Sequence, residues 1–444
     1  MFSNLAHGVR YRRYVGYLCV AIFFFALIDL LSKYEINDFV HFGPDGDTHE
    51  YQCLAVNLVS GHGYKVGWIE DFSRYKFTGS PGDISLYKET EAFDYYCNRF
   101  IKPQYSFYRT PGYPFFLALV YKIFGIYPKM VKIVQVVLFA LVVALMPLLG
   151  GLYWKKAGVV SGAITSFLLL RYFCPEPNLM LPEPLTMFSL VVWAFGMTVW
   201  ERRPTATRTF LMGLASGLIL FLRGSNAFVV LFFFLYLLFK IRSASRKVKA
   251  GALFIIGCGI ILLPWSVYAS THSGKFILLS DQLEDVLLVG NNEVTVMHGG
   301  FSNNWLSNSS CFYYKLKDTD YSAPYKTFLF LSENRRSIPQ LFRNKIRNLF
   351  SLRKVFVSIA GMFLYYYIHI IKIFFRRASR RTELHYGCQL EKAPLFPLIY
   401  FLALFLNSMI SISHFRYTVV FVFAFILPAA YMPFYVIKTL KPET

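Results

Sequence analysis

Long apolar runs alternate with short polar segments along most of the chain. Several runs approach the roughly 20 residues that an α-helix needs to cross the hydrocarbon core of a membrane. We predict ten spanning helices, of which the third is short. They lie near residues 14–33, 128–149, 156–172, 183–200, 207–223, 226–241, 249–269, 355–375, 394–413 and 416–438. The pattern predicts an all-α polytopic membrane protein with two large polar segments, 34–127 and 270–354.

Basic residues indicate which segments face the cytoplasm. With the N-terminus inside, every predicted cytoplasmic segment is basic, as the positive-inside rule requires. These segments carry Arg10, Arg12 and Arg13; Lys155 and Lys156; Arg202, Arg203 and Arg208; "KIRSASRKVK" (240–249); "RRASRR" (376–381); and Lys438 and Lys441. We therefore expect both chain ends in the cytoplasm and both large polar segments on the outer face. The first apolar run resembles a signal peptide, but it is long and no clear A-x-A site follows, so we expect a retained span.

Composition supports the membrane assignment. Hydrophobic residues make up 55% of the chain and charged residues 16%, whereas soluble domains carry about 25% charged residues. The formal net charge of +21 is compatible with nucleic-acid binding. Its clustering at the ends of apolar runs favours basic cytoplasmic loops instead. We expect membrane lipids, and no nucleic acid, as partners.

The first outer segment contains the densest group of ionisable residues. "GPDGDTHEYQCLAVNLVSGHGY" (43–64) places Asp45, Asp47, His49 and Glu50 within six positions. A helical pattern follows them, so Asp47 stands at a helix start. One interpretation is a helix cap; the other is a functional carboxylate outside a span. Farther on, "PGYPFFLALVYKIFG" (111–125) is apolar but too short to cross, which predicts an interfacial helix.

Four more ionisable residues lie near Asp47 in this topology. Arg109 precedes the interfacial helix, Glu183 begins the fourth span, Arg223 ends the fifth and Arg416 begins the tenth. Single charges at span ends are often snorkelling anchors, but several converging on one surface predict a polar site. Arginine forks bind phosphate oxygens, and a carboxylate can accept a proton from a hydroxyl. Together they fit transfer of a sugar from a lipid-linked phosphate.

The seven cysteines leave two possibilities in the first outer segment. Cys53 and Cys97 form a disulfide if that side is oxidising, or they are two buried thiols. No CxxC or HExxH pattern is present. We therefore predict no cofactor, and a divalent metal has no support from the sequence.

An ordered set of motifs resembles a known family. The set comprises "DTHEYQCLAVNLVSGHGY" (47–64), "YRTPGYPFFLALVYKIFG" (108–125), Gln135, "PEPLTMF" (182–188), "FLRGSN" (221–226), "LLPWSVYASTHSGKFILLS" (262–280), "GNN" (290–292) and "HFRYTVV" (414–420). It is similar to the polytopic GT-C glycosyltransferases that use polyprenyl-phosphate sugars, such as protein O-mannosyltransferases and the aminoarabinose transferase of lipid A. The likeness covers most of the chain to residue 292 and its end. Each motif is weak alone.

The resemblance implies an inverting glycosyltransferase of the cell inner membrane, active on its non-cytoplasmic face. It implies a GT-C-like core over residues 1–270, which includes the catalytic first outer loop 34–127. A second outer loop spans 271–354 and C-terminal spanning helices occupy 355–444. Asp47 takes the role of general base. The substrate-binding residues are Asp45, Glu50, Tyr51, Arg109, Tyr113, Glu183, Arg223, Asn291 and Arg416. A polyprenyl-phosphate sugar is the donor, and the acceptor is a lipid, glycan or protein.

Two other functions remain open at this point. A polysaccharide polymerase or ligase normally takes pyrophosphate-linked sugars and carries a large outer loop late in the chain, whereas here the charged motif lies in the first outer segment. A transporter of lipid-linked sugars places charges at mid-span, whereas these lie at span ends. The aromatic-rich insert 65–100 forms an acceptor groove or packs over the site. Family members often have Arg-Asn after the Pro-Trp pair, where this chain has Tyr268 and Ala269.

Overall fold

The computed structural model describes residues 2–34, 36, 47–67, 104–175, 179–298, 319, 321–350, 353–379, 393–410 and 418–440. Nearly all regular structure in these ranges is helical, as the apolar pattern predicts. One antiparallel pair of two-residue strands joins β1 (Lys65–Val66) to β2 (Gln104–Tyr105). The all-α class is therefore confirmed for the described part of the chain.

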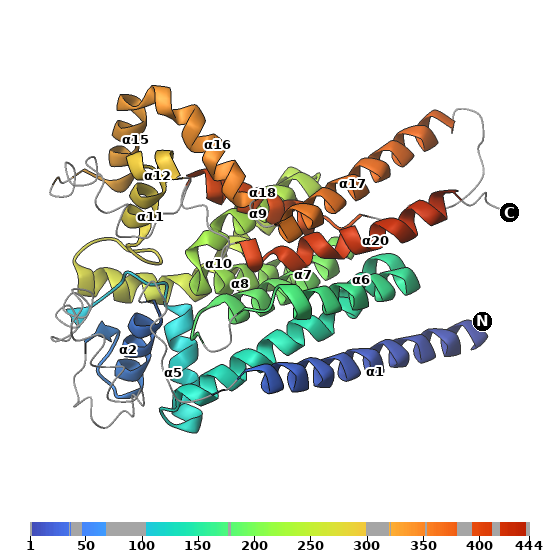
Figure 1. Ribbon diagram of the computed structural model, residues 1–444, viewed down its shortest axis with the longest axis horizontal. Helices are drawn as coiled ribbons and strands as arrows, with labels where there is room; N and C mark the ends of the chain where they lie inside the picture. Colours follow the sequence, from blue (N-terminus) through green and yellow to red (C-terminus); the bar gives the residue numbers. More distant parts are fainter. Residues whose placement is uncertain are drawn as a thin grey trace.

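Figure 1 shows the helices as a bundle with its long axis horizontal. The first half of the chain supplies α1 (Phe2–Lys33), α2 (Asp47–Val59), α5 (Gly112–Phe124), α6 (Pro128–Tyr172), α7 (Glu183–Arg202), α8 (Ala206–Leu222), η2 (Gly224–Asn226), α9 (Ala227–Lys240) and α10 (Ala244–Ser273). The second half supplies α11 (Leu283–Gly290), α12 (Glu293–His298), α15 (Ala323–Glu333), η3 (Arg335–Ser337), α16 (Ile338–Leu349), α17 (Arg353–Ser379), α18 (Phe396–Ile410) and α20 (Val422–Leu440). Both chain ends lie at one end of the bundle, and α2 and α5 lie at the other.

All ten apolar runs coincide with helices, but these helices differ in length. Five are long and apolar enough to cross a membrane: Arg13–Lys33 within α1, α6, α7, α10 and Arg353–Ile371 within α17. The runs in α8, α9, α18 and α20 form shorter apolar helices. The structure therefore supports a helical membrane protein, and the count of ten spans stays a prediction.

The 45-residue α6 contains two of the predicted spans. Trp154 (φ −125°, ψ 20°) and Lys155 (φ 53°, ψ −131°) break the helical backbone between them. Lys155 adopts the left-handed region, which is costly for a residue with a Cβ. The two arms then fold back on each other through glycine: a Cβ on Gly150 would lie 2.1 Å from the carbonyl oxygen of Gly158, and one on Gly162 would lie 2.3 Å from that of Met146. Small residues let the two backbones touch.

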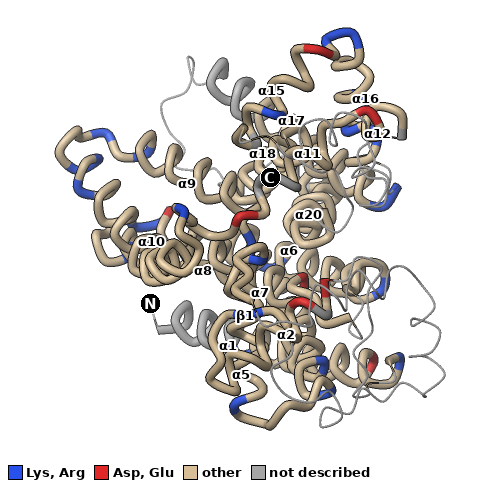
Figure 2. Tube along the Cα trace, turned by 90° about the vertical axis from the view of Figure 1, so that its left-hand side faces the viewer, with Lys and Arg blue, Asp and Glu red and all other residues tan. Residues whose placement is uncertain are grey.

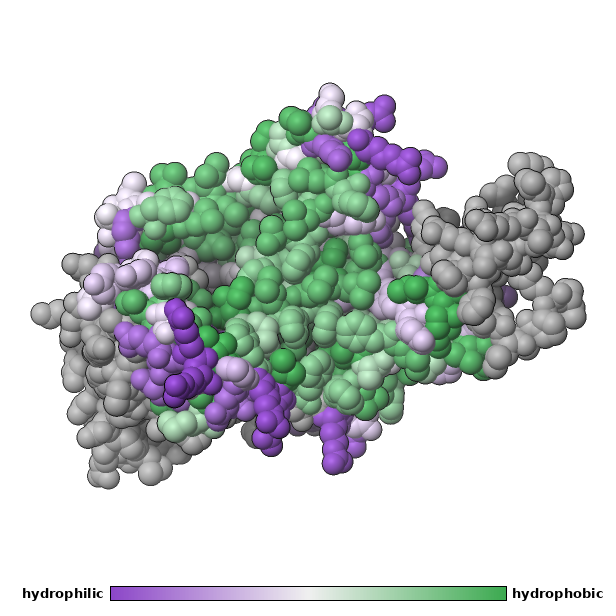
Figure 3. Space-filling view, turned by 90° about the horizontal axis from the view of Figure 1, so that it is seen from above, coloured by the Kyte–Doolittle hydropathy of each residue, from purple (hydrophilic) through white to green (hydrophobic). Residues whose placement is uncertain are grey.

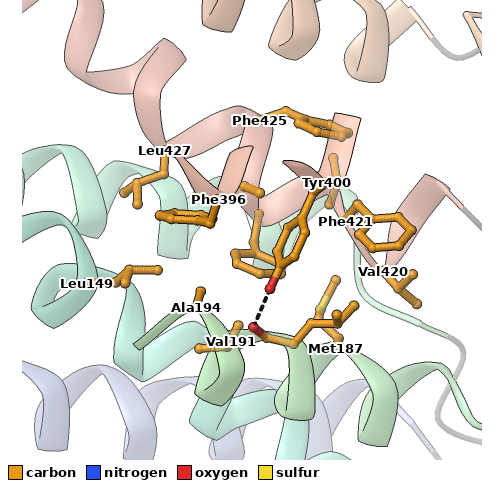
Figure 4. Close-up of a cluster of buried hydrophobic side chains, with 14 of the residues drawn as sticks. Leu149, Met187, Val191, Ala194, Phe396, Tyr400, Val420, Phe421, Phe425 and Leu427 are labelled. Carbon is orange, nitrogen blue, oxygen red and sulfur yellow. Dashed lines mark hydrogen bonds between the residues drawn. The ribbon is translucent and has the colours of Figure 1, made fainter. Parts of the chain in front are cut away.

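The main core lies where α6, α7, α18 and α20 meet. Figure 4 shows Met187, Val191 and Ala194 of α7 facing Phe396 and Tyr400 of α18, with Phe425 and Leu427 of α20 beside them. The Tyr400 hydroxyl donates to the carbonyl oxygen of Leu190 at 2.7 Å. A buried hydroxyl needs such a partner, so this bond fixes the rotation of α18 relative to α7.

The outside of the bundle is apolar as well. Figure 3 shows a broad hydrophobic surface (green) bordered by hydrophilic side chains (purple). On α1, Tyr14 and Ile28 are 69% and 66% exposed. Apolar surface this extensive is unusual for soluble proteins and is what lipid-facing helices present.

The contact between the arms of α6 gives the first testable prediction. Gly150→Ala forces the two backbones apart, because its Cβ would collide with a carbonyl oxygen rather than a movable side chain. Overpacking of this kind costs about 1–3 kcal/mol, so the melting temperature in detergent should fall measurably.

Gly16→Ala in α1 is the matched control, since a Cβ there meets nothing within 4 Å. It should leave the melting temperature unchanged or slightly raised. Equal behaviour of the two variants would contradict the proposed arm-to-arm contact.

Candidate functional site

The first turn of α2 presents two carboxylates to one arginine. Asp47 and Glu50 are three residues apart, which places them on the same face of the helix. Arg109 Nη2 lies 2.6 Å from Asp47 Oδ1, and Arg109 Nε lies 2.7 Å from Glu50 Oε2. Ser106 donates to the other Glu50 oxygen at 3.3 Å. The three charged side chains are only 11–16% exposed, so the group is a largely buried ion-pair network.

The backbone on both sides of Arg109 is fixed by contacts with distant segments. The Tyr64 hydroxyl donates to the Arg109 carbonyl oxygen at 3.1 Å. Thr110 Oγ1 donates to the Leu222 carbonyl oxygen at 2.9 Å. A Cβ on Gly112 would lie 2.7 Å from Leu222 Cα, so only glycine permits this approach of α5 to the end of α8. The same contacts therefore bring Arg109 close to Arg223, which follows Leu222.

A second ion pair joins two other helix ends. Arg223 Nη1 at the end of α8 lies 3.5 Å from Glu183 Oε1 at the start of α7. Both side chains are nearly buried, at 12% and 7% exposed. Figure 2 views the molecule end-on from this side, with acidic residues in red beside α2 and α7.

Tyr51 lies within electrostatic range of both pairs. Burial raises the pKa of its hydroxyl well above the usual value, with Arg109 and Arg223 opposing that rise and Asp47 and Glu183 adding to it. The Arg109 guanidinium lies 5.5 Å from the centre of the Tyr51 ring. The two arginine–carboxylate pairs and Tyr51 therefore form one site at the end of the bundle opposite the chain termini.

The charges of this site do not balance. Asp47, Glu50 and Glu183 face Arg109 and Arg223, so these five side chains carry one more negative than positive charge when all are ionised. Burial acts to lower the pKa of Arg109, but Asp47 and Glu50 outweigh it and hold that pKa above its ordinary value. Arg109 is thus charged throughout the physiological range.

Tyrosine and glutamine side chains link Tyr51 to neighbouring helices. The Tyr51 and Tyr113 rings meet edge to face with centroids 4.9 Å apart. The Tyr113 hydroxyl donates to Gln135 Oε1, and Gln135 Nε2 donates to the Leu179 carbonyl oxygen at 3.1 Å. This chain of hydrogen bonds connects α5, α6 and the segment before α7.

Two buried hydroxyls lie next to the ion pairs in sequence. Thr48 follows Asp47, and Thr186 lies one turn after Glu183. Both side chains are at most 1% exposed, and neither hydroxyl has a hydrogen-bond partner among the described residues. Buried hydroxyls without partners are costly, so each is a candidate to bond a ligand.

The structure brings together seven of the predicted site residues. They are Asp47, Glu50, Tyr51, Arg109, Tyr113, Glu183 and Arg223. Asp45, Arg416 and the His49 side chain lie outside the described residues. Cys53 is buried in α2, and Cys97 lies outside the described residues, so both alternatives for these two cysteines, a disulfide or two buried thiols, fall outside the described residues.

Asn291, the tenth predicted residue, belongs to a different cluster. It lies between α11 and α12 and donates to the carbonyl oxygens of Leu287 (2.7 Å) and Ile410 (2.9 Å). Lys345 Nζ donates to Asn291 Oδ1 at 2.8 Å and to the Met409 carbonyl oxygen at 2.9 Å. Asn291 and Lys345 therefore satisfy carbonyl groups at the C-terminus of α18, as cations often do at helix ends.

Sequence reasoning missed several of these residues. Lys345 lies in a basic segment, but Leu341 and Leu349 four residues on either side mark its face of the helix as buried, which is a readable signal. Ser106 and Tyr64 carry no such signal, since their partners Glu50 and Arg109 are more than 40 residues away. Thr48 and Thr186 were likewise hidden, because a lone threonine has no distinctive pattern.

Within the ranges that the structure describes, no three His, Cys, Asp or Glu side chains are grouped so that they would hold a metal ion. Comparison with protein-family models, with curated proteins and with solved structures gave no match. The functional assignment therefore depends on the geometry of the site and on the motifs of the sequence.

The buried lysine gives a second prediction. Burial lowers the pKa of Lys345 to about 7 from its ordinary 10.5. The unfolded chain then binds the proton more tightly than the folded one between these pH values, so stability should rise with pH from 7 to 10.5 by up to about 1.4 kcal/mol per pH unit. Below pH 7 both states are protonated, and the contribution is constant.

Melting curves of wild type and Lys345→Met between pH 6 and 10 test this prediction. The methionine variant should lose the Lys345 part of the rise. Lys275→Met is the control, because the Lys275 side chain is 62% exposed, and it should keep the wild-type slope. The same slope in all three proteins would contradict the prediction.

Proposed function

We propose that the protein is a membrane glycosyltransferase that moves a sugar from a polyprenyl-phosphate donor to an acceptor hydroxyl. The observation that carries the proposal is the pairing of Asp47 and Glu50 with Arg109, beside Arg223 and Glu183, at one end of an apolar helical bundle. These are the groups that the GT-C resemblance assigns to catalysis and donor binding.

In the proposed reaction, Asp47 is the general base. Its carboxylate takes the proton of the acceptor hydroxyl, and the acceptor oxygen bonds to the anomeric carbon from the face opposite the phosphate. The bond between that carbon and the phosphate oxygen breaks, and polyprenyl phosphate leaves with the electron pair. The configuration at the anomeric carbon is inverted.

The arginines hold the phosphate in this proposal. Arg109 uses Nε and Nη2 for the carboxylates, and its Nη1 makes no hydrogen bond to another described residue. This leaves N–H donors for a phosphate oxygen. Because the five described charges sum to a net negative value, a phosphate also requires further positive charge. We assign that contribution to Arg416.

The finer topology belongs to the same proposal. Ten spans with both chain ends in the cytoplasm place the ion-pair site on the non-cytoplasmic face. The apolar α5 then lies at the membrane interface beside the site, where a polyprenyl chain can follow it. Its outward side chains Phe115, Leu119 and Ile123, at i, i+4 and i+8, are 42–64% exposed, which gives the lipid an apolar surface.

The third prediction concerns the general base. Asp47→Asn keeps the size of the side chain, and asparagine caps a helix about as well as aspartate does, but it cannot accept the proton. Sugar transfer should fall by roughly 10²–10⁴-fold, measured with purified protein and a synthetic polyprenyl-phosphate sugar. The melting temperature reports the separate cost of the lost ion pair.

Glu50→Gln is the matched control for the ion pair. It removes a contact to Arg109 of nearly the same length, 2.7 Å against 2.6 Å, and leaves Asp47 ionised. The expected fall in transfer is much smaller than for Asp47→Asn. Equal losses in both variants would show that the network matters only for structure, and near-normal transfer by Asp47→Asn would remove it from the role of base.

The fourth prediction tests orientation. Ser243, between α9 and α10, and Lys275, after α10, are both exposed. After replacement of the native cysteines, a cysteine at Lys275 should react with a membrane-impermeant thiol reagent in intact cells. A cysteine at Ser243 should react only after the membrane is opened. The reverse labelling would place the site in the cytoplasm and exclude transfer on the outer face.

A further inference from the structure

The helix α16 has a buried face that fixes its rotation. Leu341, Lys345 and Leu349, spaced four residues apart, are at most 3% exposed. Lys345 bonds to Asn291 and to the end of α18, and Asn344 Nδ2 donates to the Val296 carbonyl oxygen of α12 at 2.7 Å. These contacts fix the rotation of α16, so they also determine which of its residues face away from α12 and α18.

That opposite side carries basic and apolar residues together. Arg336, Gln340, Arg343 and Arg347 follow the spacing of one helical face, and all four are exposed. Phe342 and Ile346 lie beside them and are 37% and 39% exposed. We call these six residues the α16 surface. A basic stripe next to an apolar one is the pattern of helices that lie in a membrane interface.

The arginines of the α16 surface have no acidic partner among the residues that the structure describes. Residues 321–354 contain eight Lys and Arg but one acidic residue, Glu333. Among the described residues, no carboxylate forms an ion pair with Arg336, Arg343 or Arg347. Figure 2 shows basic residues (blue) at the turn between α15 and α16. Unpaired arginines attract an anionic partner.

The position of α16 identifies that partner as lipid. Figure 1 shows α16 running across the direction of α17 and meeting its start. The start of α17 exposes Phe356 and Val357, at 51% and 66%, and the Phe356 ring lies 5.8 Å from that of Phe350, the residue that follows α16. Exposed apolar side chains of a helix long and apolar enough to cross a membrane therefore lie next to the end of α16. A soluble anionic macromolecule would account for the arginines but not for the exposed apolar residues beside them. A bilayer accounts for both, because it supplies phosphate groups next to acyl chains.

We propose that the α16 surface docks onto the bilayer, with its arginines bound to the phosphates of anionic phospholipids and Phe342 and Ile346 inserted among the acyl chains. This interaction is independent of the proposed sugar transfer. It anchors α11, α12 and α18 through Asn344 and Lys345. Basic residues in the 270–354 segment depart from the positive-inside rule if that segment is external, and lipid binding gives them a function.

The test uses the full-length protein in nanodiscs of neutral phosphatidylcholine, with or without 30% phosphatidylglycerol. Phosphatidylglycerol should raise the melting temperature of the wild type. Arg343→Gln/Arg347→Gln should lose the part of the rise due to α16, because each basic residue near an anionic surface adds to binding. Arg343→Lys/Arg347→Lys should keep it. Equal melting temperatures of all proteins in neutral nanodiscs show that the variants are folded.

Two results of this melting experiment would overturn the proposal. One is an identical phosphatidylglycerol response in the wild type and the glutamine variant. The other is stabilisation by soluble polyglutamate in neutral nanodiscs without any response to phosphatidylglycerol, which would assign the α16 surface to an acidic protein partner.

A second readout is fluorescence. A fluorophore attached to the cysteine of an Ile346→Cys variant should be quenched by lipids brominated on their acyl chains. Absence of quenching would place Ile346 outside the bilayer.

Discussion

Arg109 bears a full positive charge although only 11% of its side chain reaches the surface. Removing a guanidinium from water costs several kcal/mol unless carboxylates compensate it, and α2 supplies two within one turn. Arg109 is held in place for this pairing by hydrogen bonds on both sides. Tyr64 bonds to the Arg109 carbonyl oxygen, and Thr110 bonds to Leu222 at the end of α8. Loss of either carboxylate partner therefore leaves a buried guanidinium less well compensated and should lower stability.

The two ion pairs have different partners but a common neighbour. The pKa of Tyr51 is influenced by both arginines and by two of the three paired acids, Asp47 and Glu183, and its ring lies against Tyr113. The two groups of charges therefore share one electrostatic neighbour. Because they lie close together, the effects of substitutions in the two groups should not be additive.

The sequence was informative where the pattern is local. Apolar runs located the helices, and the helical pattern that follows the acidic residues placed Asp47 at a helix start, where α2 begins. Lys155 between two apolar runs marked a break that the structure shows as a reversal of α6. Long-range partners were not readable: Arg109 is 62 residues from Asp47, and nothing in either segment specifies the other. Asn291 was placed in the site by its motif, and its hydrogen bonds to Leu287, Ile410 and Lys345 were not readable from that motif.

The reversal of α6 has a consequence for the order of assembly during synthesis. The two arms close on each other through Gly150, Gly158 and Gly162 without any later segment. The helix that completes the core beside them, α20, begins about 250 residues after α6 ends. At about 5–20 residues per second, the ribosome needs on the order of 12–50 s to deliver it. The Ser161 hydroxyl, which in the folded protein donates to the Leu427 carbonyl oxygen at 3.1 Å, lacks that partner during this interval, so the side of α6 that packs against α20 stays uncovered until the end of the chain is made.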